Sequence, residues 1–81
     1  MARSVWLEIA LEQYSNLPTD VQALIDARID ALLDNPTPSD AGYDAGTDQW
    51  TTTFGSGVGL ILYAVVPTQE SVIILRLVGT P

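Results

Sequence analysis

The sequence predicts an α+β fold in the order β-α-α-β-β-β, with two helices packed on one face of a small antiparallel sheet. Two observations lead to it. Apolar residues recur at helical spacing as far as Asp34, and from Gln49 onward the pattern changes to the alternation that is typical of strands. The length of 81 residues predicts one domain over residues 1–81, with a small core.

The N-terminal half predicts one short strand and two helices. Arg3–Leu7 is the expected strand, and the first helix is expected to end near Asn16. Its apolar stripe comprises Leu7, Ala10, Leu11, Tyr14 and Leu17. In the second helix Thr19 is the predicted N-cap residue, and Gln22 follows at the spacing of a capping box. Its buried stripe is predicted to contain Val21, Leu24, Ile25, Ile29, Leu32 and Leu33. Pro36 ends this helix, because it disfavours helical geometry at the residue before it.

Three aspartates of the second helix, Asp26, Asp30 and Asp34, follow one another at intervals of four residues on its solvent side. They could form a cation site or face a basic partner, but a solvated helix face is the favoured interpretation, because hard cations usually take their ligands from a compact loop. The aspartates of the loop 37–48 do not have the spacing of a calcium loop. The sequence therefore predicts no metal site and no cofactor.

The C-terminal half predicts three strands joined by tight turns. Gln49–Phe54 alternates, and a Gly-Ser-Gly turn leads from it into Val58–Val66. Pro67–Glu70 forms a second turn, and Ser71–Val78 is the last strand. The first of these strands is predicted to carry Trp50, Thr52 and Phe54 on one face.

The strand at residues 58–66 is apolar on both faces. One face carries Val58, Leu60, Leu62, Ala64 and Val66. The other face carries Ile61, Tyr63 and Val65. Two helices can cover only one of these faces, and an apolar patch of this size is rarely left bare on a soluble monomer. A partner segment or a second copy of the chain is therefore expected to cover the other.

Composition excludes several classes of function. The chain has ten acidic residues against three arginines (Arg3, Arg28 and Arg76), which gives a net charge of −7, so direct binding to nucleic acid is not expected. It has no cysteine and no histidine, and it therefore lacks the usual thiolate and imidazole ligands and catalysts. The longest apolar run is too short to span a bilayer. These features predict a cytoplasmic protein without a membrane partner.

The ordered motifs resemble a known family. "LP" stands before the second helix, "LLDNP" ends it, and a loop, a strand and a glycine turn lead to "LILYAVV" and "VIILRL". This arrangement resembles the RelE/ParE superfamily of toxins from type II toxin–antitoxin modules, and the likeness covers nearly the whole chain. The resemblance implies a toxin-like function and an antitoxin-like partner that wraps the toxin with an extended or helical tail.

The chain departs from the family where the chemistry takes place. Many ribonuclease members have an Arg-x-x-Tyr motif, whereas here Leu60 stands three residues before Tyr63. The family's basic ending is replaced by Gly79-Thr80-Pro81, so Arg76 is the remaining cation of the last strand. Cleavage by attack of a 2′-hydroxyl on phosphate needs positive groups to hold the developing charge. The sequence therefore predicts an interaction protein with weak or no mRNA interferase activity.

The resemblance also implies where a partner binds. The Tyr63 face is expected to pack on the helices, and the other face is expected to carry Val72, Ile74, Arg76 and Val78 beside Leu60 and Leu62 if the register matches. The predicted partner-binding residues are Leu60, Leu62, Ile74 and Arg76.

Two other functions stay open. An active toxin, a ribosome-dependent mRNA endonuclease or gyrase inhibitor, would rely on Arg76 and Tyr63 as catalytic residues. An acidic regulator or decoy would instead bind a basic protein through the aspartates of the second helix. The simpler roles are an Arg76 paired with Glu70 or an aspartate, and a core Tyr63 whose hydroxyl reaches a partner at the surface.

Overall fold

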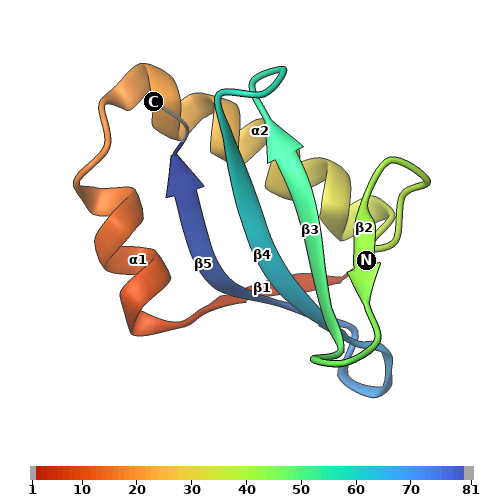
Figure 1. Ribbon diagram of the computed structural model, residues 1–81. Helices are drawn as coiled ribbons and strands as arrows, with labels where there is room; N and C mark the ends of the chain where they lie inside the picture. The colour runs from red at the N-terminus through yellow and green to blue at the C-terminus, as the bar shows by residue number, and fades with distance from the viewer. Residues whose placement is uncertain (1, 80–81) are drawn as a thin grey trace.

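The computed structural model describes residues 2–79; Met1 and the last two residues of Gly79-Thr80-Pro81 lie outside the described part. The elements in chain order are β1 (Arg3–Trp6), α1 (Glu8–Ser15), α2 (Thr19–Asp34), β2 (Gly42–Asp44), β3 (Gln49–Phe54), β4 (Gly59–Val66), the short 3-10 helix η1 (Pro67–Gln69) and β5 (Ser71–Gly79). Figure 1 shows their arrangement.

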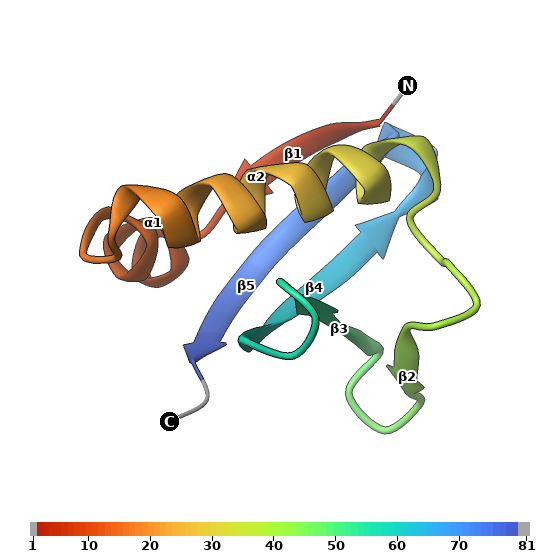
Figure 2. The same cartoon turned by 90° about the horizontal axis from the view of Figure 1, so that it is seen from above.

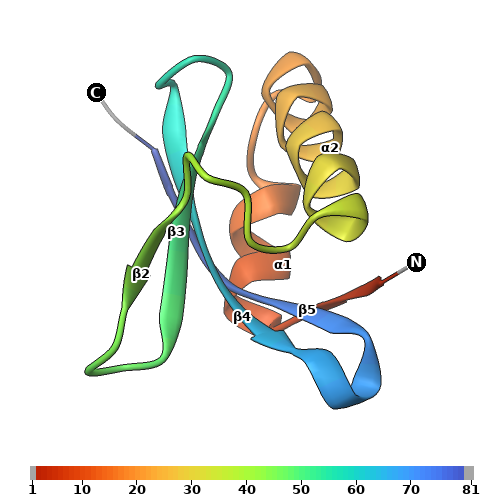
Figure 3. The same ribbon diagram turned by 90° about the vertical axis from the view of Figure 1, so that its right-hand side faces the viewer.

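The five strands form one sheet in the order β1-β5-β4-β3-β2. The helix α2 lies across one face of this sheet, and α1 lies beside β5 (Figures 2 and 3). We call the face turned away from α2 the open face; Figure 1 looks onto it. The predicted α+β class, with two helices packed against the sheet, is confirmed.

The sheet is mixed, and the prediction of a purely antiparallel sheet is wrong for β1. β1 pairs in parallel with β5, whereas the other neighbours are antiparallel. β1 joins the rest of the sheet through the two helices, so no tight hairpin turn dictates its direction.

Helix α1 lies along the edge of β5, and only a narrow strip of its surface is buried. Ala10 is fully buried, but Leu7 at 43% and Leu11 at 51% are exposed, so the predicted apolar stripe is wrong at these two positions. The side-chain oxygen of Gln13 accepts a hydrogen bond of 2.8 Å from the backbone N–H of Leu77. Gln13 thereby satisfies the edge of β5 beyond the point where β1 ends.

Helix α2 begins without the predicted capping box. Pro18 occupies the N-cap position, no side chain caps the helix, and Thr19 is already helical. The side-chain amide of Gln22 instead donates a hydrogen bond of 2.8 Å to the carbonyl of Tyr14. Gln22 therefore links α2 to α1, a long-range contact that outweighs the local capping pattern.

The apolar stripe of α2 is largely as predicted. Ile25, Ile29 and Leu32 are buried, and Val21 and Leu33 pack against the core. Leu24 is the exception, because it lies at the margin of the helix–sheet contact and is 40% exposed. The helix ends at Asp34, and Asn35 is extended before Pro36, as predicted.

The strand β2 was not predicted, because three residues are too few for an alternating pattern to be recognised. It pairs with the first half of β3 at the edge of the sheet. The hydroxyl of Tyr43 donates a hydrogen bond of 2.7 Å to Asp48, which closes the short β2–β3 hairpin. Asp48 has a positive φ of 55°, a conformation that aspartate tolerates better than most residues.

A bulge in β5 changes which residues share a face. Leu62 lies opposite Arg76, but its neighbour Tyr63 lies opposite Ile74, so Leu75 is the extra residue of β5. Ile74 therefore points to the same side as Tyr63 and is fully buried. The prediction that Val72 and Ile74 lie beside Leu60 is wrong, because it assumed uninterrupted alternation.

The core lies between α2, α1 and the sheet. Its buried apolar residues are Ala10, Ile25, Ile29, Leu32, Phe54, Ile61, Tyr63, Val72, Ile74 and Leu77. Thr52 is buried among them, and its hydroxyl accepts a hydrogen bond of 3.0 Å from Nε of Arg28. Arg28 also forms an ion pair of 2.9 Å with Asp40, so one arginine joins α2, β3 and the loop before β2.

Candidate functional site

The open face is built by alternate residues of β3, β4 and β5. Leu60 pairs with Val78, and Leu62 pairs with Arg76, so the predicted residues Leu60, Leu62 and Arg76 share this face. Thr51 and Thr53 of the neighbouring strand β3 pair with Leu62 and Leu60, so the two threonines lie on the same face as the leucines. Ile74, the fourth predicted partner-binding residue, faces the core instead.

A depression of about 420 Å³ opens on this face where α1 meets β5. It is lined by Leu7, Ile9, Gln49, Leu62, Leu75 and Arg76. No pattern in the sequence marks Leu7, Ile9 or Leu75 as site residues. The bulge brings Leu75 here. Leu7, the N-cap residue of α1, and Ile9 in its first turn come from the helix that lies beside the edge of β5 (Figure 1). The exposure of Leu7 and Ile9, at 43% and 45%, is explained by this position.

Arg76 is exposed on the open face, and within residues 2–79 its side chain has no hydrogen bond or ion pair. The predicted pairing of Arg76 with Glu70 or an aspartate is therefore wrong. The other two arginines are engaged elsewhere. Arg28 binds Thr52 and Asp40 on the helix side, and Arg3 donates a 3.4 Å hydrogen bond to Ser71.

Tyr63 lies on the opposite face of the sheet from Arg76. It is fully buried, and its hydroxyl donates a hydrogen bond of 2.9 Å to the carbonyl of Pro36, two residues beyond the end of α2. Its ring stacks on Trp50 with a centroid distance of 6.4 Å. The two candidate catalytic residues do not converge, and Tyr63 has the geometry of a core residue.

The environment of Tyr63 raises the pKa of its phenol above the ordinary value near 10. Burial is the main cause, because it disfavours the charged phenolate. The positive charge of Arg28 acts in the opposite direction, and the negative charge of Asp40 adds to the increase. The hydroxyl therefore stays protonated at neutral pH and serves as a hydrogen-bond donor.

This pKa shift predicts a loss of stability in alkali. Because the folded pKa of Tyr63 lies above its unfolded value, its contribution is complete below about pH 10 and is lost as the pH rises through the folded pKa. We expect the free energy of unfolding to fall above about pH 10, and to fall less steeply in Tyr63→Phe. Urea titrations at several pH values measure this.

Tyr14 and Tyr43 are present in both proteins, so their raised pKa values cancel from the comparison. Parallel profiles of the parent and Tyr63→Phe would contradict the assignment to Tyr63.

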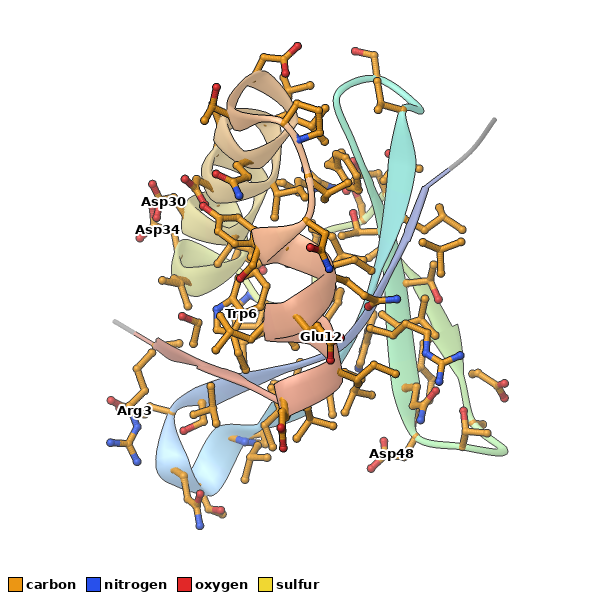
Figure 4. All side chains as sticks on the ribbon, turned by 90° about the vertical axis from the view of Figure 1, so that its left-hand side faces the viewer. Arg3, Trp6, Glu12, Asp30, Asp34 and Asp48 are labelled. Carbon is orange, nitrogen blue, oxygen red and sulfur yellow. The ribbon has the colours of Figure 1, made fainter. Side chains whose placement is uncertain are left out.

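The aspartates of α2 are turned away from the sheet. Figure 4 shows Asp30 and Asp34 projecting from the outer side of α2. Asp26 accepts a hydrogen bond of 2.8 Å from the hydroxyl of Tyr14. Across residues 2–79 no group of three or more potential metal-ligating side chains comes together. Within the same part of the chain, no helix is long and apolar enough to cross a membrane.

A second hollow, of about 440 Å³, lies between the start of α2, the β3–β4 turn and the end of β5. Its apolar lining consists of Leu17, Val21, Phe54, Val58 and Leu77. It is separate from the depression on the open face, with which it shares no lining residue.

Comparison with known proteins gives matches at the level of structure. No protein-family model and no curated protein matches the chain. The isolated RelE toxin of E. coli superposes with a TM-score of 0.87 and 15% identity over 100% of this chain and 86% of that chain.

Two toxin–antitoxin complexes are also similar. The intact E. coli RelBE complex matches with a TM-score of 0.86 and 15% identity, covering 100% of this chain and 99% of that chain. The archaeal RelE–RelB complex from Pyrococcus horikoshii matches with a TM-score of 0.73 and 18% identity, covering 96% and 93%. The chain therefore has the fold of the RelE toxins.

Proposed function

We propose that this chain is a divergent toxin-type component of a toxin–antitoxin module. It acts in the cytoplasm through protein–protein interaction, with weak or no mRNA interferase activity. Its open face binds polypeptide, either an antitoxin-like partner or a second copy of the chain. The RelE fold supports this proposal, because solved structures of that fold include toxins in complex with RelB-type antitoxins.

One observation carries the proposal: the depression on the open face is lined mainly by leucine and isoleucine side chains, whereas phosphate chemistry needs several cations. Leu60 and Leu62 stand on β4, and Arg76 is the arginine that reaches the depression. Removing a single positioned donor from an active site costs about 10²- to 10³-fold in rate. A depression whose described lining contains one cation is therefore poorly suited to hold the charge that develops on a cleaved phosphate.

Long-range electrostatics support the same conclusion. With a net charge of −7, the protein is repelled by ribosomal RNA and by DNA, so its encounter rate with either is low. Charge repulsion does not oppose the binding of an uncharged polypeptide segment to the apolar open face. Burial of Leu60 and Leu62 against such a polypeptide contributes roughly 25 cal/mol of binding free energy per Å² of apolar surface.

A cleavage assay with programmed ribosomes tests the proposal. We expect the purified protein to cleave ribosome-bound message at least about 100-fold more slowly than an active RelE-type toxin, because the stabilising cations are missing. Arg76→Ala is expected to leave this low rate unchanged. The measurement is the cleavage rate, together with growth of cells that express the chain.

Arg3→Ala is the matched control, since it removes an equal charge from outside the depression. Cleavage near the rate of an active toxin, abolished by Arg76→Ala and kept in Arg3→Ala, would overturn the proposal in favour of an active toxin centred on Arg76.

A further inference from the structure

We propose that a second copy of this chain covers the open face, with the two sheets packed face to face in a twofold-symmetric dimer. The inference rests on the proposed function in one respect, that the open face binds polypeptide. It goes further by identifying the occupant and its orientation. The layers of the dimer are helix, sheet, sheet and helix.

The first support is the continuity of the apolar surface. Exposed side chains lie at its borders, on β1, at the start of α1 and at the end of β5: Val5, Leu7, Ile9 and Val78. Between them the partly buried Leu60, Leu62 and Leu75 fill the middle. Val5 pairs with Ile73, which pairs with Ala64, so the patch extends across three neighbouring strands. Such a contiguous patch marks an interaction surface.

The second support is the way in which charge is segregated. Four of the acidic residues lie on α2, on the far side of the sheet: Asp20, Asp26, Asp30 and Asp34. Facing sheets lie about 10 Å apart, and each helix layer lies about 10 Å further out, so the two α2 helices would be about 30 Å apart. This distance exceeds the Debye length of about 8 Å at physiological salt, so repulsion between the aspartates of the two α2 helices is largely screened.

The third support is that the depression is complementary to itself in charge. Arg76 lies within it and has no hydrogen bond or ion pair to any residue of the described part of the chain, while Glu8 stands between the lining residues Leu7 and Ile9. In a twofold interface, if one residue contacts another, the second contacts the first in return. Arg76 of each copy can therefore pair with Glu8 of the other, twice in one dimer.

The size of the face sets the expected affinity. Stable interfaces bury about 800 Å² per partner, which is about one sixth of the 4961 Å² accessible surface of this chain. Strands β1, β5, β4 and β3 have four, nine, eight and six residues. With a rise of about 3.3 Å per residue and a spacing of about 4.8 Å they present roughly 430 Å² in projection, before side-chain relief is added. The dimer interface is therefore smaller than that of a standard stable complex, and we expect a weak dimer with a Kd of about 10 to 100 µM.

Sedimentation equilibrium of the purified chain, from about 1 µM to about 1 mM, tests the inference. We expect a reversible monomer–dimer equilibrium. Ile9→Asp is expected to raise the dimer Kd at least tenfold, because it buries a carboxylate in the apolar interface. Leu11→Asp is the matched control. Leu11 lies on the same helix and is similarly exposed at 51%, but it does not line the depression, so its Kd is expected to be unchanged.

A charge reversal tests the orientation. Arg76→Glu is expected to raise the Kd about threefold to tenfold, and adding Glu8→Arg to the same chain is expected to restore it. A monomer at about 1 mM, or equal effects of Ile9→Asp and Leu11→Asp, would overturn the dimer. No restoration would overturn the proposed pairing. These measurements need neither ribosome nor antitoxin. A monomeric chain would therefore contradict the dimer but not the proposed function, and cleavage of message would contradict the proposed function but not the dimer.

Discussion

Replacing Tyr63 with alanine is expected to lower the free energy of unfolding by about 4 kcal/mol, the range found for large aromatic residues removed from a core. The side chain is fully buried, stacks on Trp50 and donates its hydroxyl to the carbonyl of Pro36. Truncation leaves a cavity and also leaves that carbonyl without its donor. Urea unfolding followed by tryptophan fluorescence measures the loss, because Trp50 is the stacking neighbour.

The size of this effect matters because the chain is small. At about 0.05 to 0.15 kcal/mol per residue, 81 residues give a total stability of about 4 to 12 kcal/mol, so the variant keeps little or none of it at the lower end. Tyr43→Ala is the matched control. Tyr43 also contacts the ring of Trp50, at 4.8 Å, but it is 50% exposed, and we expect it to cost less than about 1.5 kcal/mol. Equal losses in the two variants would contradict the assignment of Tyr63 to the core.

The elements that the sequence predicted well are those whose pattern repeats. The second helix has four turns of apolar spacing and a proline beyond its end, and its observed bounds, Thr19–Asp34, follow that pattern. The strands at residues 49–54, 59–66 and 71–79 are runs of six to nine strand-forming residues bounded by turn residues, and each was predicted within one residue at its ends. Long periodic segments average over individual exceptions, which makes them predictable.

The features that were missed depend on contacts between distant segments. Gln22 has the spacing of a capping residue, but a carbonyl of α1 lies within reach, and the side chain binds there instead. The strand β2 exists because β3 offers it an edge to pair with, while its own three residues carry no pattern. Neither outcome is encoded within the few residues concerned.

The candidate site was predicted in part, for the same reason. Leu60, Leu62 and Arg76 lie on the open face as alternation required. Ile74 does not, because the bulge at Leu75 reverses the alternation on one side of it only. No local sequence signal marks this bulge: neither Ile74 nor Leu75 is a glycine. Leu7 and Ile9 reach the site from α1, a contact that strand periodicity does not address.

Gly59→Ala is expected to lower the free energy of unfolding by about 3 kcal/mol, the upper part of the range for overpacking. A Cβ atom at this position would lie 2.5 Å from the ring of Phe54 and 2.6 Å from the backbone oxygen of Val78. The ring is buried in the core, and the oxygen belongs to the neighbouring strand β5, so neither moves without cost. Thermal unfolding measures the effect.

Gly42→Ala provides the comparison, because Gly42 also lies in a strand but has open space where its Cβ would be. We expect this substitution to change stability by less than about 0.5 kcal/mol. If Gly59→Ala were as stable as Gly42→Ala, Phe54 would have to move away from β4. That movement would open the hollow lined by Phe54, Val58 and Leu77, and an increase in the exposure of Phe54 to solvent would reveal it.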